Sequence, residues 1–172
     1  GNIEPRKNIV TILKAFEIAC DRLDNAVSLV LAGKLGWRTQ PIIEAIEHNK
    51  YKDRIYLPGY ISEDEKKYLM HDACAFVFPS NYEGFGIPIV EAMSCGGVVI
   101  TADNSSLKEV GGTTAFYVQK TDEVVQLADR MVQCFNLSDA ERKKLMADGK
   151  SWASQFSWEK CAQETQAVLE QG

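Results

Sequence analysis

Two acids and two glycines stand close together near the middle of the chain. Glu83 directly precedes Gly84 and Gly86, and Glu91 follows Glu83 after seven intervening residues. The apolar residues 74–78 before them predict a buried strand. Glycine lets a main chain pass close to a ligand and point its N–H groups at it. The carboxylates could therefore hold hydroxyl groups while the main chain binds phosphate.

A helix is expected directly after this loop, over residues 86–94. Its free N–H groups and its dipole favour an anion at the N-terminus, where a phosphate could dock. The residues alone leave two other interpretations open. An ordinary strand-to-helix turn would use Glu91 only to satisfy the dipole. A glycosidase needs two carboxylates that face each other across a bond, which spacing along one loop and helix does not establish.

Composition limits the kinds of partner. The chain has 172 residues, of which 45% are hydrophobic and 25% charged, as expected for one globular domain. The net charge of -5 gives no basic surface for nucleic acid, and any membrane contact is expected to be peripheral at most. The two histidines and five cysteines lack metal-ligand spacing, so we expect no metal site and reduced, mostly packed thiols.

Strands and helices are predicted to alternate along the chain. This alternation is typical of an α/β, Rossmann-like, doubly wound parallel sheet, which binds ligands at the carboxyl ends of its strands. Gly1 and Asn2 look like the end of a central first strand, so we expect the sequence to begin inside a larger protein. The expected strands are 27–32, 54–57, 74–78, 98–101 and 115–118, and the expected helices are 8–22, 62–71, 86–94 and 124–135, with others starting near 39, 138 and 157. Trp152, Phe156 and Trp158 are expected to pack the terminal helices together.

Residues 76–96 closely resemble the signature of the group-one, retaining glycosyltransferases of GT-B architecture. The central feature of that signature is a glutamate, seven residues and a second glutamate, here Glu83 and Glu91. The resemblance implies the C-terminal, nucleotide-sugar-binding half of such an enzyme, spanning residues 1–172, with the N-terminal acceptor domain absent. Other stretches that agree in the same order are residues 4–8, 31–34, 57–62, 105–110 and 156–159.

The resemblance also implies roles for particular residues. Glu83 would hold hydroxyls of the donor sugar, and Glu91 would hold the ribose. Lys7 would neutralise the diphosphate and, with Glu83, is the expected catalytic pair. Many relatives carry a further arginine five residues before this lysine, where this chain has Asn2, so Arg6 is the candidate for the missing charge.

Main-chain groups are implied for the rest of the donor. The N–H groups of Gly84, Phe85 and Gly86 would meet the diphosphate. Tyr60 and Ile61 would lie at the nucleobase. Further positions expected to face the same cleft are Gly33, Lys34, Ser105 and Ser106.

The function implied is transfer of a hexose from GDP-mannose or a UDP-sugar, with retention, to a glycan or lipid-linked acceptor. The setting implied is bacterial polysaccharide or lipopolysaccharide synthesis, in the cytoplasm or at the inner face of the membrane. No Asp-x-Asp metal site is seen, and we expect no cofactor beyond the donor. A non-catalytic nucleotide-sugar-binding module and a GT-B sugar-nucleotide epimerase remain alternatives. A receiver domain would need an acidic cluster at its first strand, which is not apparent.

Overall fold

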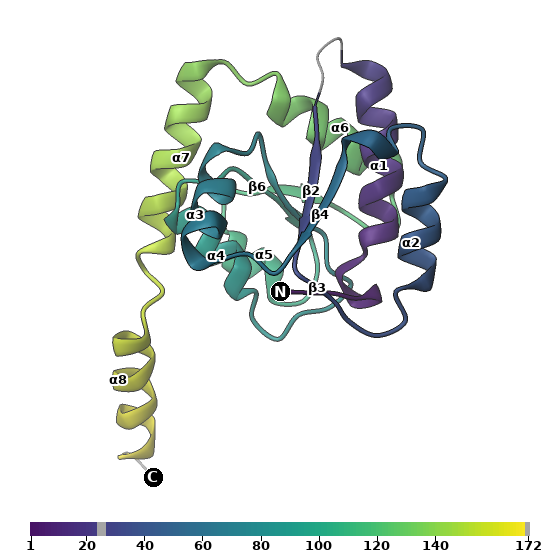
Figure 1. Ribbon diagram of the computed structural model, residues 1–172. Helices are drawn as coiled ribbons and strands as arrows, with labels where there is room; N and C mark the ends of the chain where they lie inside the picture. The colour runs from purple at the N-terminus through teal and green to yellow at the C-terminus, as the bar shows by residue number, and fades with distance from the viewer. Residues whose placement is uncertain (24–26, 171–172) are drawn as a thin grey trace.

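The computed structural model describes residues 1–23 and 27–170, and strands and helices alternate through them (Figure 1). The strands are β1 (Asn2–Ile3), β2 (Leu29–Ala32), β3 (Lys34–Leu35), β4 (Ile55–Gly59), β5 (Phe76–Phe78), β6 (Val99–Ala102) and β7 (Phe116–Val118). The helices are α1 (Ile9–Arg22), α2 (Gln40–Glu47), α3 (Glu63–Asp72), α4 (Ile87–Ser94), α5 (Leu107–Gly111), α6 (Val124–Phe135), α7 (Asp139–Ala153) and α8 (Trp158–Leu169). Short 3-10 helices cover Pro5–Lys7 and Lys52–Arg54.

Every strand pairing in the described residues is parallel. The order β5-β6-β7 forms one sheet, β2 pairs with β4, and β1 pairs with β3. All four residues of β6 are buried, as expected for a strand that is covered on both faces. This confirms the predicted α/β class with its parallel strands.

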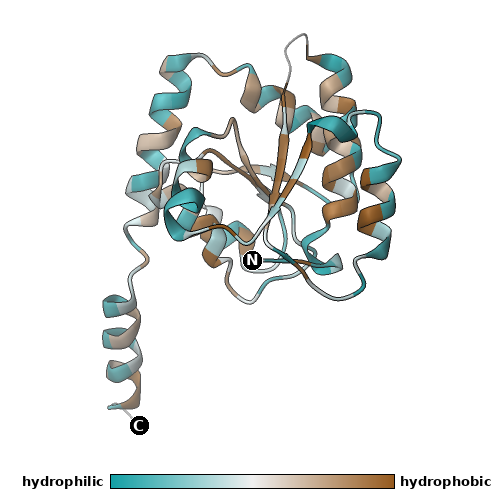
Figure 2. Ribbon diagram, viewed as in Figure 1, coloured by the Kyte–Doolittle hydropathy of each residue, from teal (hydrophilic) through white to brown (hydrophobic). Residues whose placement is uncertain are grey.

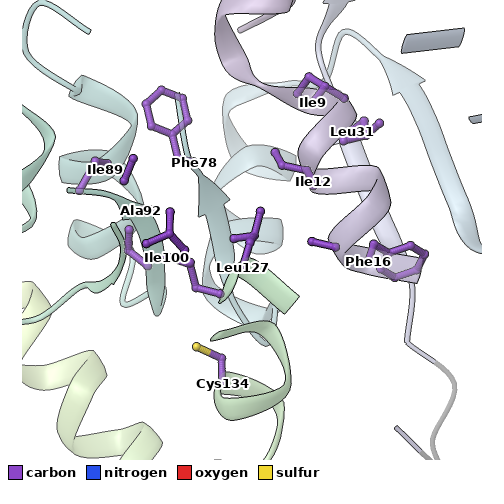
Figure 3. Close-up of a cluster of buried hydrophobic side chains, with 14 of the residues drawn as sticks. Ile9, Ile12, Phe16, Leu31, Phe78, Ile89, Ala92, Ile100, Leu127 and Cys134 are labelled. Carbon is purple, nitrogen blue, oxygen red and sulfur yellow. The ribbon is translucent and has the colours of Figure 1, made fainter. Parts of the chain in front are cut away.

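The core lies between the strands and two groups of helices (Figures 1 and 3). Helix α1 packs against α6 and α2, while α4 packs against α3, α5 and α7. Leu13, Ile89, Ile100 and Leu127 are 0–1% exposed, and burial of each such side chain contributes roughly 1.5–3 kcal/mol. Figure 2 shows the separation of core and surface, with hydrophobic residues along β2 and β4 and hydrophilic ones on the outer sides of the helices.

The predicted helix starts are confirmed in atomic detail. Ser62 and Ser138 each form a capping box with the glutamate three residues later, at the starts of α3 and α7. Strand β1 overlaps the strand end that was expected at Gly1 and Asn2. The sequence did not predict its pairing with β3, because a two-residue strand leaves no hydrophobic periodicity to recognise.

The expectation for the aromatic residues near the C-terminus is partly wrong. The rings of Trp152 and Phe156 are in edge contact, with centroids 6.0 Å apart. Trp158, however, is 77% exposed on α8, which extends away from the other helices (Figure 1). In the described residues of α8 none is buried, so its apolar side chains have no core to pack against.

All five cysteines are free, and three of them are packed, as expected. Cys20 and Cys134 are buried, Cys95 is half-buried, and Cys74 and Cys161 are exposed. Burial raises the pKa of Cys134 to about 12. The expectation is therefore wrong for Cys74 and Cys161, which face solvent.

Candidate functional site

A tight turn positions two cations in front of α1. Pro5 starts the 3-10 helix, and Asn8 ends it in the left-handed conformation with φ 58°. The Asn8 side chain donates hydrogen bonds to the carbonyls of Pro79 and Thr121, and the Asn81 N–H donates to the Arg6 carbonyl at 3.0 Å. The turn is therefore tied to the loop that follows β5.

The loop after β6, which contains residues 104–106, holds the main chain of Glu83 from the other side. The Glu83 N–H donates to Ser105 Oγ at 3.4 Å, and Ser106 Oγ donates to the Glu83 carbonyl at 3.1 Å. Ser105 has φ 43°, an uncommon conformation for a residue with a side chain. Asn104 Nδ2 donates to the Asn81 carbonyl at 3.1 Å. The predicted 105–106 loop therefore contacts the backbone of Glu83.

Both cations converge on the Glu83 carboxylate. Lys7 Nζ lies 2.7 Å from Oε1, and Arg6 Nη1 lies 2.6 Å from Oε2. The Lys7 ammonium also lies 4.5 Å from the centre of the Phe78 ring, a cation–π contact. Arg6 donates further to the Tyr82 carbonyl at 3.0 Å and to Glu4 Oε1 at 2.9 Å. The structure therefore brings together three of the predicted site residues, Arg6, Lys7 and Glu83.

The charges in this cluster shift each other's protonation. Burial raises the pKa of Glu83, but hydrogen bonds from Lys7 and Arg6 outweigh burial and hold the pKa below its ordinary value. The hydrogen bond to Glu83 raises the pKa of Arg6. The Glu83 and Lys7 side chains are only 11% and 16% exposed, so water screens their attraction less than at an open surface.

The glycine loop leads from Glu83 to an open helix start. Gly86 is the N-cap of α4 with φ 112°, and no side chain caps the helix. A Cβ on Gly86 would lie 3.1 Å from Leu107, whereas a Cβ on Gly84 would meet nothing within 4 Å. The fold therefore requires glycine at 86, while open space borders Gly84. Phe85 turns its ring onto Phe156, with centroids 5.7 Å apart.

The second acid, Glu91, lies on α4 and pairs with Lys66, a residue for which the sequence analysis predicted no role in the site. Lys66 Nζ lies 3.1 Å from Glu91 Oε1 and 2.7 Å from Glu63 Oε2. The hydrogen bond to Glu63 raises the pKa of Lys66 most, and Glu91 adds to it against the effect of burial. Only the packing of α3 on α4 reveals this contact.

A third group of predicted residues lies after β2 and β4. The Gly33 N–H donates to the Gly59 carbonyl at 2.8 Å, and Lys34 Nζ lies 5.6 Å from the centre of the Tyr60 ring. Tyr60 is 74% exposed. A Cβ on Gly33 would lie 1.8 Å from the Gly1 carbonyl oxygen, so close packing alone explains the glycine.

Ile61 directly follows Tyr60 in the chain. It lines an apolar hollow of about 370 Å³, together with Val30, Tyr56, Pro58, Glu65, Tyr68 and Leu69. In the described residues no hydrogen bond or ion pair joins the side chains of Glu91 or Tyr60 to the Arg6, Lys7 and Glu83 cluster. The predicted site residues therefore form separate groups on different loops and helix starts.

The arrangement can bind an anion beside hydroxyl groups. Lys7 and Arg6 supply positive charge, and the main chain at residues 84–87 supplies N–H groups directly before and at the start of α4. Further along, Pro88 has no N–H and the Ile89 N–H already donates to the Gly86 carbonyl at 2.9 Å. The carboxylates of Glu83 and Glu91 can accept hydrogen bonds from hydroxyls. Within residues 1–23 and 27–170, no three His, Cys, Asp or Glu side chains gather where they could hold a metal ion. Asp103 instead pairs with Lys108 at 2.9 Å.

Residues 1–152 match the family model described as glycosyl transferases group 1. The chain is 36% identical over 165 residues to O-antigen chain mannosyltransferase B of Escherichia coli, an alignment that covers 96% of this chain and 43% of that protein. It is 30% identical over 158 residues to the serotype-specific mannosyltransferase WbdA of Escherichia coli, covering 91% of this chain and 19% of WbdA.

A solved structure gives the same fold. The crystal structure of Anabaena HepE in complex with UDP and glucose matches all of this chain and 47% of HepE, with a TM-score of 0.81 and 22% identity. The fold is therefore the Rossmann-like fold found in GT-B glycosyltransferases. The chain spans less than half the length of each of these three proteins.

Proposed function

Because the chain belongs to the group 1 glycosyl transferases, we propose that it binds a nucleoside-diphosphate sugar and forms the donor half of a glycosyltransferase site. One observation carries the proposal. Lys7 and Arg6 converge on Glu83 directly before a glycine loop and an uncapped helix start. A diphosphate needs this combination of positive charge and free N–H groups.

Each part of the donor has a place in this proposal. The diphosphate takes the N–H groups of residues 84–86 and draws Lys7 and Arg6 toward it. Glu83, relieved of part of its pairing, accepts hydrogen bonds from the sugar. Glu91 accepts them from the ribose, and the turn at Tyr60 and Ile61 reads the base.

The chemistry follows from charge. The bond between the anomeric carbon and the phosphate oxygen breaks, and the electron pair leaves with the nucleoside diphosphate. The acceptor oxygen bonds to the same carbon, and its proton passes to the oxygen of the leaving diphosphate. Groups that stabilise charge on the leaving diphosphate lower this barrier, so Lys7 and the start of α4 would contribute most. Transfer with retention, and without a divalent metal, is part of the proposal.

GDP-mannose is our first candidate donor, because both relatives above are named mannosyltransferases. A UDP-sugar is the second, since the HepE structure contains UDP and glucose. The names of the relatives support a glycan or lipid-linked acceptor in O-antigen or related polysaccharide synthesis.

We place the reaction in the cytoplasm, with at most a peripheral contact with the membrane. No helix in the described residues is long and apolar enough to cross a bilayer.

A second domain is proposed to supply the acceptor site. In the described residues the strands fall into separate parallel sheets, with β2 and β4 in one and β5, β6 and β7 in another. We propose that, in a longer protein, a parallel strand upstream of Gly1 joins these two sheets. The 172-residue chain alone should then bind donor without transferring sugar.

Calorimetric titration with GDP-mannose, UDP-glucose, GDP and UDP tests the proposal. We expect saturable binding of one sugar nucleotide and weaker binding in Glu91→Ala, by about tenfold for a lost hydrogen bond to a charged group. Glu47→Ala, at the end of α2, is the matched control and should bind like the wild type. Absence of binding for all four ligands would contradict the proposed function.

A further inference from the structure

Lys66 differs from its neighbour on α3 in what it contacts. Its ammonium bridges Glu63 on the same helix and Glu91 on α4, at 2.7 and 3.1 Å, and its side chain is 25% exposed. Lys67 pairs with Asp64 across one turn at 3.4 Å, and its side chain is 62% exposed. The Lys67 pair is an ordinary helix-surface contact, worth a few tenths of a kcal/mol.

The contact of Lys66 with Glu91 crosses between two elements that the site uses separately. Helix α3 begins directly after the turn at Tyr60 and Ile61, and α4 begins directly after the glycine loop. A lysine that joins them fixes where the Glu91 carboxylate stands relative to that turn. A contact within one helix would not do so.

We propose that Lys66 is a positioning residue, which acts through Glu91 to aim its carboxylate at the ribose hydroxyls of the donor. Lys66 occupies one lone pair of Oε1 and thereby fixes the plane of the carboxylate. A carboxylate has about four acceptor positions, so the remaining ones stay available for two hydroxyls. This inference rests on the proposed function, in which Glu91 holds the ribose.

The expected signature is selectivity for ribose rather than affinity alone. If Lys66 aims Glu91, its removal weakens the bonds to the two hydroxyls and leaves the diphosphate contacts intact. Removal of the Lys66 ammonium should therefore lower the affinity for a nucleotide without these hydroxyls only a little. If Lys66 acted only through its positive charge, both nucleotides would weaken equally.

The test compares GDP with 2′,3′-dideoxy-GDP by calorimetric titration, or UDP with its dideoxy form if the wild type prefers UDP. Lys66→Met keeps the aliphatic length without the charge, and Lys67→Met is the matched control. We expect Lys66→Met to weaken GDP about five- to tenfold and dideoxy-GDP less than twofold, from the strength of hydrogen bonds to charged groups. Lys67→Met should change neither.

Three further measurements keep the outcomes distinct. Lys66→Arg should restore most of the GDP preference. Lys66→Gln, with the same expected loss as Lys66→Met, replaces it if thermal melting shows that the methionine variant is unfolded. In a Glu91→Ala background, Lys66→Met should have no further effect on either nucleotide.

If Glu91→Ala loses the preference for GDP while Lys66→Met keeps it, the role of Lys66 is wrong and the donor site stands. If Glu91→Ala keeps the preference, the ribose assignment in the proposed function is itself wrong. Equal weakening of both nucleotides by Lys66→Met would also overturn the inference.

Discussion

Replacement of Lys7 by methionine should weaken donor binding through a loss of charge alone. Methionine keeps the aliphatic stem over Phe78 and removes the ammonium that lies 2.7 Å from Glu83. A hydrogen bond to a charged group is worth about 1.5–3 kcal/mol, or roughly 10- to 150-fold in Kd. Before the donor binds, however, Lys7 is already paired with Glu83, and the diphosphate must compete with Glu83 for the Lys7 ammonium. We therefore expect the lower part of this range, about 10- to 30-fold.

The assay is calorimetric titration of Lys7→Met with GDP-mannose and GDP at low and high salt. The affinity of the variant should also fall less steeply with salt, because one ionic contact is gone. Lys14→Met, at an exposed position of α1, removes the same charge and should bind like the wild type. Equal affinity in Lys7→Met and wild type would refute the reasoning, as would an equal loss in Lys14→Met.

Three further predictions concern protonation, thiols and metals. The pKa of Glu83 lies below its ordinary value of 4.5, so its contribution to stability is present above about that pH and is lost as pH falls through the lowered pKa. The difference in Tm between wild type and Glu83→Gln should therefore shrink from about pH 6 to about pH 3, and a constant difference would contradict the ion pairs. At mildly alkaline pH, a thiol reagent should label Cys74 and Cys161 in the native chain. It should reach Cys20 and Cys134 only after unfolding, because burial raises the pKa of both buried thiols. Mass spectrometry identifies the labelled sites, and early labelling of Cys134 would argue against its burial. The affinity for GDP should be the same in a titration with Mg²⁺ and in a titration with excess EDTA. A large loss of affinity in EDTA would overturn the proposed metal independence.

The sequence predicted the features that depend on local chemistry. Hydrophobic periodicity predicted α1 and α6 closely, and the serine and glutamate pairs at Ser62 and Ser138 predicted two helix starts. The family signature also selected Lys7 and Glu83 together, although 76 positions separate them. Local rules and a known motif were enough for these.

Features that depend on packing between distant elements could not be predicted in the same way. Lys66 stands in a run of charges that looks like any solvated helix face, and only the position of α4 brings Glu91 to it. Trp158 was expected to pack because tryptophan usually does, yet α8 has no partner in the described residues. The sequence selected Arg6 as a candidate cation in place of Asn2, but only the structure shows that its guanidinium pairs with Glu83.

The most direct test of the account is the position of a bound nucleotide in a crystal structure of this chain with GDP or UDP, whichever binds. We predict that the diphosphate lies within hydrogen-bond distance of Lys7 Nζ and of the N–H groups of residues 84–86, with the ribose hydroxyls on Glu91. A diphosphate bound away from the start of α4, with the Lys7 and Glu83 pair undisturbed, would contradict the central claim.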